Sequence, residues 1–279
     1  MSTPSTSLVL VSVGNTRTRF ASVIAEHGSG GRLEPSQVLV NDDAGAIAAA
    51  IAEAAGKQEG EPTAMIASVN HPAAEQIENA LHRADVKVLR FGRDLQIPIL
   101  HSLDDASTVG QDRLLDALGA FARSTQACIV IDAGTAVTVD FVDGQGTFHG
   151  GAIAPGVQMM LRALHEQTAA LPLVTISREM LPPQTDSVSD DAIPPFGKDT
   201  AHAIALGVAS AVRGLVHHLI DRYAAFYKAY PRVVATGGDA PLLFEGDPLV
   251  ETIVPDLTLV GMLEAVQRLE KIDERMEEM

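Results

Sequence analysis

The sequence predicts an α/β protein made of two similarly built halves with a cleft between them. Along its 279 residues, short apolar runs rich in β-forming side chains alternate with segments of helical periodicity, the pattern of α/β folds. One unit also recurs about half a chain apart: an apolar strand, a glycine-threonine turn and a returning strand. The two turns are Gly14-Asn15-Thr16 and Gly134-Thr135. We expect one domain over residues 1–123 and a second over residues 124–279.

The first half should contain alternating strands and helices. Residues 8–11 form an apolar β-run, and residues 17–24 alternate loosely, as a strand returning from the turn at Gly14 would. Asp42 and Asp43 can cap an alanine-rich helix that ends at Gly56. The other elements expected here are a strand at residues 65–69, a helix at 72–84, a strand at 86–91 and a helix at 111–123.

The second half begins with an apolar strand at residues 128–131 and returns through residues 137–142, after which Asp143-Gly144 signals a hairpin. The further elements expected are a helix from Gly156 to about residue 169, a polar loop at 177–196, a long helical region at 198–230, a strand at 233–236 and an amphipathic helix at 257–279. We expect the long helical region to be interrupted or closely packed at Gly207 and Gly214.

Composition excludes several classes of protein. A formal net charge of −16 disfavours nucleic-acid binding, which depends on lysine and arginine neutralising phosphates. The single cysteine, Cys128, lies in an apolar run, so it excludes an intramolecular disulfide and a multi-cysteine zinc site, and we expect a buried thiol. The polar first residues and the lack of an apolar stretch of about 18 residues predict a soluble, cytoplasmic protein that binds no membrane.

The two glycine-threonine turns are the first candidates for chemistry. The sequence has no G-x-x-x-x-G-K-[ST] motif, which disfavours a P-loop nucleotide site. A hairpin with glycine at its tip lets backbone N–H groups approach an anion, and a threonine or asparagine adds a donor. Either turn alone reads more simply as an ordinary tight turn. Two such turns facing a cleft favour binding of the phosphate chain of ATP.

Two acidic residues are the next candidates. Asp132 ends a buried strand at the second turn, where a carboxylate either binds a cation or caps the turn. Gly110-Gln111-Asp112-Arg113 opens a helix, where backbone amides and Arg113 could hold an anionic group. Asp112 would face the same space, although it could also serve only as a helix N-terminal charge.

Taken together, these motifs resemble one family. The chain is similar, from about Leu8 to Gly261, to the type III pantothenate kinases. The matching segments, in the family's order and spacing, are Gly14-Asn15-Thr16, Gly110-Gln111-Asp112-Arg113, Asp132-Ala133-Gly134-Thr135, Gly150-Gly151 with Pro155-Gly156, and Thr236-Gly237-Gly238, with further likeness at Leu171-Pro172 and Gly197-Lys198-Asp199-Thr200. The resemblance implies the acetate and sugar kinase/actin-like superfamily, with two ribonuclease-H-like domains. It also implies transfer of the γ-phosphate of ATP to pantothenate in coenzyme A biosynthesis.

The resemblance also implies roles for individual residues. Asp112 would be the general base, and pantothenate would contact Gly110, Gln111, Arg113 and Thr200, the last across a homodimer interface. Asp132 would hold a monovalent cation, K⁺ or NH₄⁺, and Mg²⁺ would arrive with ATP. The residues implied to bind ATP are Ser12, Val13, Gly14, Asn15, Thr16, Arg17, Thr18, Arg19 and Thr135. Gly237-Gly238 would lie near the nucleoside.

Two positions depart from the family pattern. Ser12 stands where the family's first hairpin has an aspartate expected to organise Mg²⁺ and phosphate, and Leu103 stands where the family tends to have a tyrosine against pantothenate. A hydroxyl is a poorer ligand for Mg²⁺ than a carboxylate. Two alternatives therefore stay open: a weakened or inactive relative that serves as a binding or accessory protein, and a kinase for another small hydroxyl substrate.

Overall fold

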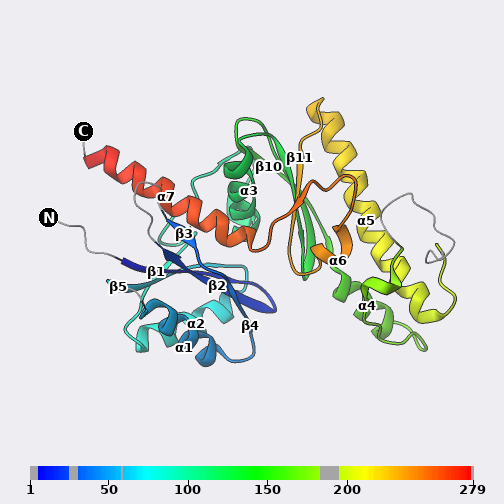
Figure 1. Ribbon diagram of the computed structural model, residues 1–279, viewed down its shortest axis with the longest axis horizontal. Coiled ribbons are helices and arrows are strands. Elements are labelled where there is room, and N and C mark those ends of the chain that lie inside the picture. The colour runs from blue at the N-terminus through cyan, green and yellow to red at the C-terminus, as the bar shows by residue number, and fades with distance from the viewer. Residues whose placement is uncertain (1–5, 25–30, 58, 183–194, 278–279) are drawn as a thin grey trace. The chain divides into compact units, whose positions relative to one another are not determined.

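Two β-sheets organise the chain into two units (Figure 1). The computed structural model describes residues 6–24, 31–57, 59–182 and 195–277. Unit 1 consists of the chain up to Ser124 together with the chain from Asp256 onward, and unit 2 consists of the chain from Thr125 to Pro255. The boundary at Ser124 lies beside the one expected at residue 123. The C-terminal segment, expected in the second domain, differs and belongs to unit 1.

The sheet of unit 1 is built on β1 (Thr6–Val13), an apolar strand rich in β-branched residues. Its other strands are β2 (Arg17–Ile24), β3 (Arg32–Leu33), β4 (Gln37–Val40), β5 (Glu61–Ser68) and β6 (Lys87–Arg90). β1 pairs antiparallel with β2 and parallel with β5, and β5 pairs parallel with β6. The strand order is β3-β2-β1-β5-β6, with β4 also paired to β2. The short strand β7 (Leu100–His101) follows later in this unit.

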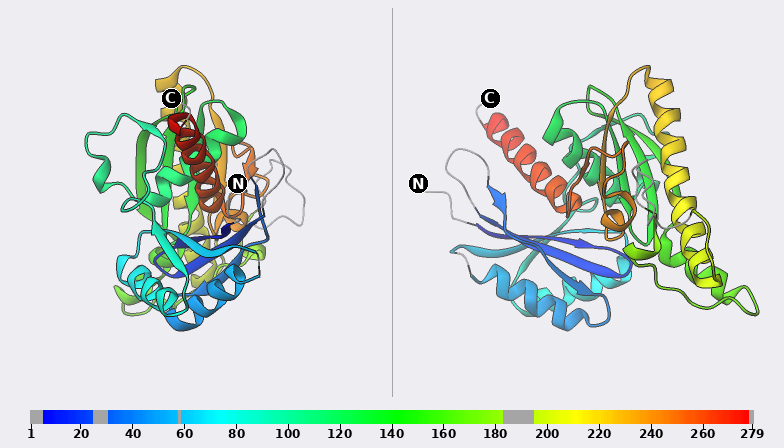
Figure 2. Two further views of the ribbon diagram at one scale, coloured as in Figure 1. Left: turned by 90° about the vertical axis from the view of Figure 1, so that its left-hand side faces the viewer. Right: turned by 45° about the vertical axis from the view of Figure 1, so that its right-hand side comes forward.

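Helices cover both faces of this sheet. The helices of unit 1 are α1 (Ala44–Ala55), α2 (His71–Arg83), α3 (Gln111–Ser124) and α7 (Leu257–Glu277). Because side chains alternate along a strand, Val9 and Val11 of β1 enter a core with α1 and α2. Leu8 and Leu10 enter a second core with α3 and α7. Figure 2 shows α1 and α2 side by side on their face of the sheet.

Close packing of α7 on α3 explains why the C-terminal segment belongs to unit 1. Gly119 of α3 and Gly261 of α7 meet where the helices cross, and a Cβ on Gly261 would collide with the backbone oxygen of Leu115. Thr258 Oγ1 donates to the buried carboxylate of Asp116 over 2.7 Å. An apolar core alone would not distinguish the two units as partners for α7. The glycines at this crossing let the backbones of α3 and α7 approach closely, which adds a specific contact between α7 and unit 1.

The sheet of unit 2 has the order β12-β11-β8-β9-β10. β9 pairs antiparallel with β8 and β10, and β11 pairs parallel with β8 and β12. Cys128 at the start of β8 is fully buried, which confirms the expected buried thiol, and burial raises its pKa to about 12. The elements of unit 2 are β8 (Cys128–Ala133), β9 (Ala136–Val142), β10 (Thr147–Pro155), α4 (Val157–Glu166), α5 (Thr200–Tyr227), β11 (Arg232–Thr236), α6 (Ala240–Phe244) and β12 (Thr252–Ile253).

The long helix α5 is continuous, contrary to the expected interruption at Gly207 and Gly214. Both glycines lie on its exposed face, and a Cβ on either would meet nothing within 4 Å. The opposite face carries buried residues such as Val212 and Val216 into the core of unit 2. By length and composition α5 could also cross a membrane, a test that core helices of soluble proteins pass as well.

Some elements differ from their expected extents. The helix expected from Gly156 to residue 169 is α4, which ends at Glu166. The preceding residues form β10, a strand that the sequence pattern did not indicate because Gly150 and Gly151 interrupt it. The expected loop at 177–196 lies partly outside the described residues. Its described part contains a short 3₁₀ turn, Arg178–Met180.

Candidate functional site

The first glycine-threonine turn connects β1 to β2 at one end of the unit 1 sheet. Gly14 N–H donates to Arg17 O over 3.0 Å and closes the turn. Asn15, Thr16 and Arg17 are exposed at the tip, whereas Val13 and Thr18 are buried. Of the residues expected to bind ATP, the tip therefore offers Asn15, Thr16 and Arg17 to a ligand. On the sides of the hairpin, Val13 and Thr18 are buried, whereas Ser12 and Arg19 are partly exposed.

Two asparagines outside the motif hold this turn in place. Asn41 Nδ2 donates to Gly14 O over 2.7 Å, its Oδ1 accepts from Thr18 Oγ1 over 2.7 Å, and its backbone N–H donates to Thr16 O over 3.0 Å. Asn70, the N-cap of α2, donates from Nδ2 to Asn15 O over 3.3 Å. The buried hydroxyl of Thr18 is thus used within the fold.

Ser12 and Arg19 face each other across the hairpin. They are paired in register between β1 and β2, and Ser12 is partly exposed. Arg19 Nη1 contacts Asp256 Oδ1 over 2.6 Å, and Ser36 Oγ donates to Asp256 Oδ2 over 2.5 Å. Asp256 has a left-handed backbone (φ 57°) at the residue where the chain re-enters unit 1. The guanidinium of Arg19 therefore has a protein partner in this structure.

The start of α3 carries the Gly110-Gln111-Asp112-Arg113 motif. Arg113 N–H donates to Asp112 Oδ1 over 2.8 Å, a bond between neighbouring residues in the first turn of the helix. A Cβ on Gly110 would lie 2.5 Å from that oxygen, which explains the glycine. Desolvation raises the pKa of Asp112 above its usual range, although the backbone hydrogen bond and the charge of Arg113 oppose the rise. Asp112 as a residue is partly exposed.

The second glycine-threonine turn lies in unit 2 between β8 and β9. Gly134 N–H donates to Ala136 O over 2.9 Å, and Gly156 N–H donates to Thr135 O over 3.1 Å. A Cβ on Gly156 would collide with the carbonyl oxygens of Gly134 and Thr135. The glycine before α4 therefore packs directly on this turn, and Thr135 is exposed at its tip.

Asp132 lies next to the glycine pair after β11. A Cβ on Gly237 (φ 93°) would collide with Asp132 Oδ1 and with Ala133 O, and Asp239 N–H donates to Ala133 O over 2.9 Å. Within unit 2 the structure thus brings together Asp132, the Thr135 turn and Gly237. Carboxylate and carbonyl oxygens of this kind suit a hard cation.

Thr200 lies elsewhere in unit 2, as the first residue of α5. Asp199 Oδ1 accepts from His202 N–H over 2.8 Å and caps the helix, which leaves Thr200 exposed. A Cβ on Gly197 would collide with the backbone of Ala203, so the glycine of this motif allows the chain to turn tightly onto the helix. Lys198 Nζ lies 4.3 Å from the ring centre of Phe196.

The described residues contain no group of three or more histidine, cysteine, aspartate or glutamate side chains that could hold a metal ion. A preformed magnesium cage is therefore absent from this part of the chain. Mg²⁺ that arrives with ATP needs only one or two protein oxygens, because phosphates and water supply the rest.

Three residues at the site, Asn41, Ser68 and Asn70, are not among those that the sequence motifs predict. A signal existed for Asn70, since an asparagine two residues before a proline at a helix start is a common N-cap. Asn41 and Ser68 carried no comparable signal. Their roles depend on which strand ends lie together in the fold.

Comparison with known proteins supplies the family context. A family model for type III pantothenate kinase matches residues 8–222. A type III pantothenate kinase of Rhodospirillum rubrum is 43% identical over 170 residues, which cover 61% of this chain and 60% of that protein. One from Acidiphilium cryptum is 41% identical, and the match spans 55% of its length. One from Syntrophotalea carbinolica is 33% identical over 71% of this chain and 73% of its own.

Solved structures establish the fold. A Campylobacter jejuni protein assigned to the Baf family of transcriptional activators aligns over 94% of this chain and 99% of its own, with a TM-score of 0.54 and 18% identity. A ROK family glucokinase from Streptomyces griseus aligns over 93% of this chain and 98% of its own, with a TM-score of 0.50 and 14% identity. These likenesses confirm the predicted α/β fold with two ribonuclease-H-like units.

The raised pKa of Asp112 predicts that the stability of the fold depends on pH. The folded state holds the Asp112 proton more tightly than the unfolded chain does, so stability falls as pH rises from the ordinary value of 3.8 through the raised pKa. The full cost is present once the pH exceeds the raised pKa. We expect Asp112→Asn to raise Tm at pH 7 by roughly 2–4 °C, the response of a chain of this size to about 1 kcal/mol.

The gain should vanish near pH 3, where Asp112 is protonated in both states. Thermal unfolding of the wild type and Asp112→Asn at both pH values measures it. Asp85→Asn is the matched control, because Asp85 is exposed and asparagine tolerates its left-handed backbone. A lower Tm for Asp112→Asn at pH 7 would contradict the desolvation argument.

Proposed function

The chain belongs to the type III pantothenate kinase family, and we propose that it transfers the γ-phosphate of ATP to the hydroxyl of pantothenate. The product would be 4'-phosphopantothenate, in the first step of coenzyme A biosynthesis. The single observation that carries the proposal is the start of α3, where desolvation raises the pKa of Asp112 next to the charge of Arg113.

Asp112 is the proposed general base. It would take the proton from the primary hydroxyl of pantothenate as that oxygen attacks the γ-phosphorus of ATP. A raised pKa suits this task, because a base works best when its pKa approaches the operating pH. Arg113 would bind the pantothenate carboxylate, whose geometry a guanidinium matches. Gly110 would let the substrate approach the backbone.

The two turns are the proposed phosphate sites. Asn15, Thr16 and Arg17 are exposed at the tip of the first turn, and Thr135 is exposed at the second. Their backbone N–H groups and side-chain donors would hold the phosphates of ATP. Catalysis would then come mainly from positioning and from stabilising charge, as in phosphoryl transfer generally.

Cations would complete the reaction. Mg²⁺ would come with ATP and neutralise phosphate charge. Asp132, with the carbonyl of Ala133 beside it, would hold a monovalent cation, K⁺ or NH₄⁺, and its oxygen donors fit such an ion. We place the enzyme in the cytoplasm, where its substrates occur, and expect neither nucleic acid nor a membrane as a partner.

Ser12 favours one alternative, a weakened or inactive relative that acts as a binding or accessory protein. The hydroxyl cannot supply the negative charge that the family's aspartate would bring. Asp112 and Arg113 argue against complete loss of activity. Kinase assays with other small hydroxyl substrates test the remaining alternative, which Leu103 permits.

A coupled assay with ATP, Mg²⁺, K⁺ and pantothenate tests the proposal directly. We expect Asp112→Asn to lower kcat at least about 100-fold, the low end for a lost general base, and to leave ATP binding nearly unchanged. Asp85→Asn should keep wild-type turnover. If Asp112→Asn retains most of the turnover, Asp112 is only a charge at a helix end.

Ser12→Asp tests the departure at the first hairpin. A carboxylate there should orient Mg²⁺ and the γ-phosphate better, and we expect kcat to rise about 10-fold or more, since a misplacement of about 1 Å can cost about 10²-fold. Ser12→Ala should bring no such rise. Steady-state kinetics at saturating ATP, Mg²⁺ and K⁺ measure the change. Unchanged or lower turnover in Ser12→Asp would mean that the site is built around serine.

We propose a homodimer in which Thr200 contacts the pantothenate bound by the partner subunit. The support is the outward face of α5, which begins at Thr200. This face is exposed and built of small uncharged residues: Ala203, Gly207, Ser210, Ala211 and Gly214. Such a stripe lets two helices approach closely. It also offers an uncharged contact between two chains that each carry a net charge of −16.

Light scattering at micromolar concentration should therefore give twice the chain mass of 29.4 kDa. We expect Gly207→Arg to give the monomer mass, because the long charged side chain would separate the helices. Ala49→Arg, on the exposed side of α1, is the matched control and should leave the dimer intact. A monomeric wild type would contradict the role of Thr200 across an interface.

A further inference from the structure

We propose that Gln111 is a positioning residue whose side-chain amide fixes the first turn of α3 to the ends of β5 and β6. The inference rests on the proposed function, in which the neighbouring Asp112 and Arg113 take part in the reaction and must be correctly positioned. It concerns unit 1 alone.

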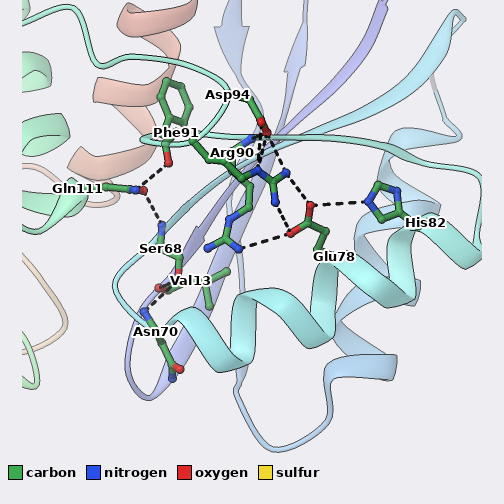
Figure 3. A network of polar contacts seen from close by, with 10 residues as sticks. Val13, Ser68, Asn70, Glu78, His82, Arg90, Phe91, Asp94 and Gln111 are labelled. Atoms are coloured by element: carbon green, nitrogen blue, oxygen red, sulfur yellow. Dashed lines mark hydrogen bonds and ion pairs between the residues drawn. The ribbon is translucent and has the colours of Figure 1, made fainter. Parts of the chain in front are cut away.

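The Gln111 amide takes the place of a bond in the parallel ladder between β5 and β6. Phe91 N–H donates to Ile66 O over 2.9 Å, which continues the register of the two strands. The next bond of a parallel ladder would run from Ser68 N–H to Phe91 O. Instead, Ser68 N–H donates to Gln111 Oε1 over 3.1 Å, and Gln111 Nε2 donates to Phe91 O over 2.7 Å (Figure 3).

This insertion satisfies two backbone groups that would otherwise be left unpaired where the strands separate. Buried N–H and C=O groups need a partner, and leaving one unpaired costs about 1–3 kcal/mol as a general rule. The amide has one donor end and one acceptor end at the required spacing. Each end makes one bond to the backbone, and through these bonds Gln111 fixes the placement of α3.

Gly92 shows that space for the amide is built into the turn after β6. Its backbone is left-handed (φ 79°), and a Cβ there would collide with Gln111 Nε2. Only glycine meets both requirements at once. The loop after β6 and the first residue of α3 are therefore fitted to each other.

The strand ends that hold Gln111 are themselves fixed. Ser68 Oγ donates to Val13 O over 3.3 Å and accepts from Asn70 N–H over 2.9 Å, which ties this junction to the first hairpin and to α2. At the end of β6, Asp94 Oδ2 accepts from Arg90 N–H over 2.8 Å. The amide thus bridges two rigid anchors (Figure 3).

Ion pairs to the buried Glu78 also hold the end of β6 in place. Glu78 of α2 accepts from Arg90 Nη1 over 3.4 Å and from Arg93 Nη2 over 2.7 Å. Burial alone would raise the pKa of Glu78, but the hydrogen bonds and charges of Arg93 and Arg90 bring its pKa below the ordinary value. Arg90 therefore stays paired to a charged carboxylate at neutral pH, and β6 presents Phe91 O from a fixed position.

Gln111→Leu removes both hydrogen-bonding ends of the amide and keeps a side chain of similar bulk. We expect kcat with pantothenate to fall about 10-fold or more, because Asp112 loses its fixed distance to the hydroxyl. The Kd for pantothenate, from calorimetry, should change less than about 3-fold. In the substrate-free protein, the Ser68 amide should exchange with solvent faster. Gln145→Leu, at an exposed turn of unit 2, is the matched control and should change none of these values.

Three results would overturn the proposal: a wild-type kcat in Gln111→Leu, a Kd that rises as far as kcat falls, or an unchanged Ser68 exchange rate. A rise in Kd together with an unchanged Ser68 exchange rate would make Gln111 a substrate ligand. Gln111→Asn keeps a polar amide but is one methylene too short to span both backbone groups. If Gln111→Leu does not fold, Gln111→Asn tests the proposal in its place. We expect the same fall in kcat and the same small change in Kd. If the wild-type chain does not phosphorylate pantothenate, the proposed function is wrong. The change in the Ser68 exchange rate between wild type and Gln111→Leu then still tests whether Gln111 joins the two strand ends.

Discussion

The need to pair backbone groups where strands end governs unit 1. At the first hairpin and at the start of α3, strands separate and leave N–H and C=O groups that the sheet cannot satisfy. Side-chain amides satisfy them: Asn41 binds Gly14 O, Asn70 binds Asn15 O, and Gln111 bridges Ser68 and Phe91. Each amide comes from another part of the chain. The placement of both candidate motifs therefore depends on contacts that are distant in sequence.

In unit 2, glycines allow the backbone to pack closely around the second turn. Around the second turn, Gly156 and Gly237 bring backbone against the carbonyls of residues 133–135 and against the carboxylate of Asp132. No side chain could be accommodated at either contact. The glycine pairs of the sequence are thus explained by close packing, and their proximity to Asp132 and Thr135 makes this turn a compact, oxygen-rich surface. The two turns share a motif but are supported in physically different ways.

Much of the fold could be predicted from sequence, because its signals are local. The alternation in β1, the caps of α1 and the turn at Gly14 each depend on neighbouring residues. The partner of α7 could not be predicted, since an amphipathic helix does not specify which surface covers it. In the candidate site, the sequence located the motifs but did not show that the side chains of Thr18 and Arg19 have partners within the fold. Their partners, Asn41 and Asp256, lie 23 and 237 residues away.

The environment of Asp112 separates the two interpretations that its position allowed. A carboxylate that serves only as a helix N-terminal charge is stabilised by the helix dipole, and its pKa is lowered. Asp112 has the opposite shift, because desolvation outweighs the backbone hydrogen bond and the neighbouring Arg113. An asparagine could accept the same hydrogen bond from Arg113 N–H without that cost. The raised pKa of Asp112 therefore supports its proposed role as a general base over a purely electrostatic role at the helix start.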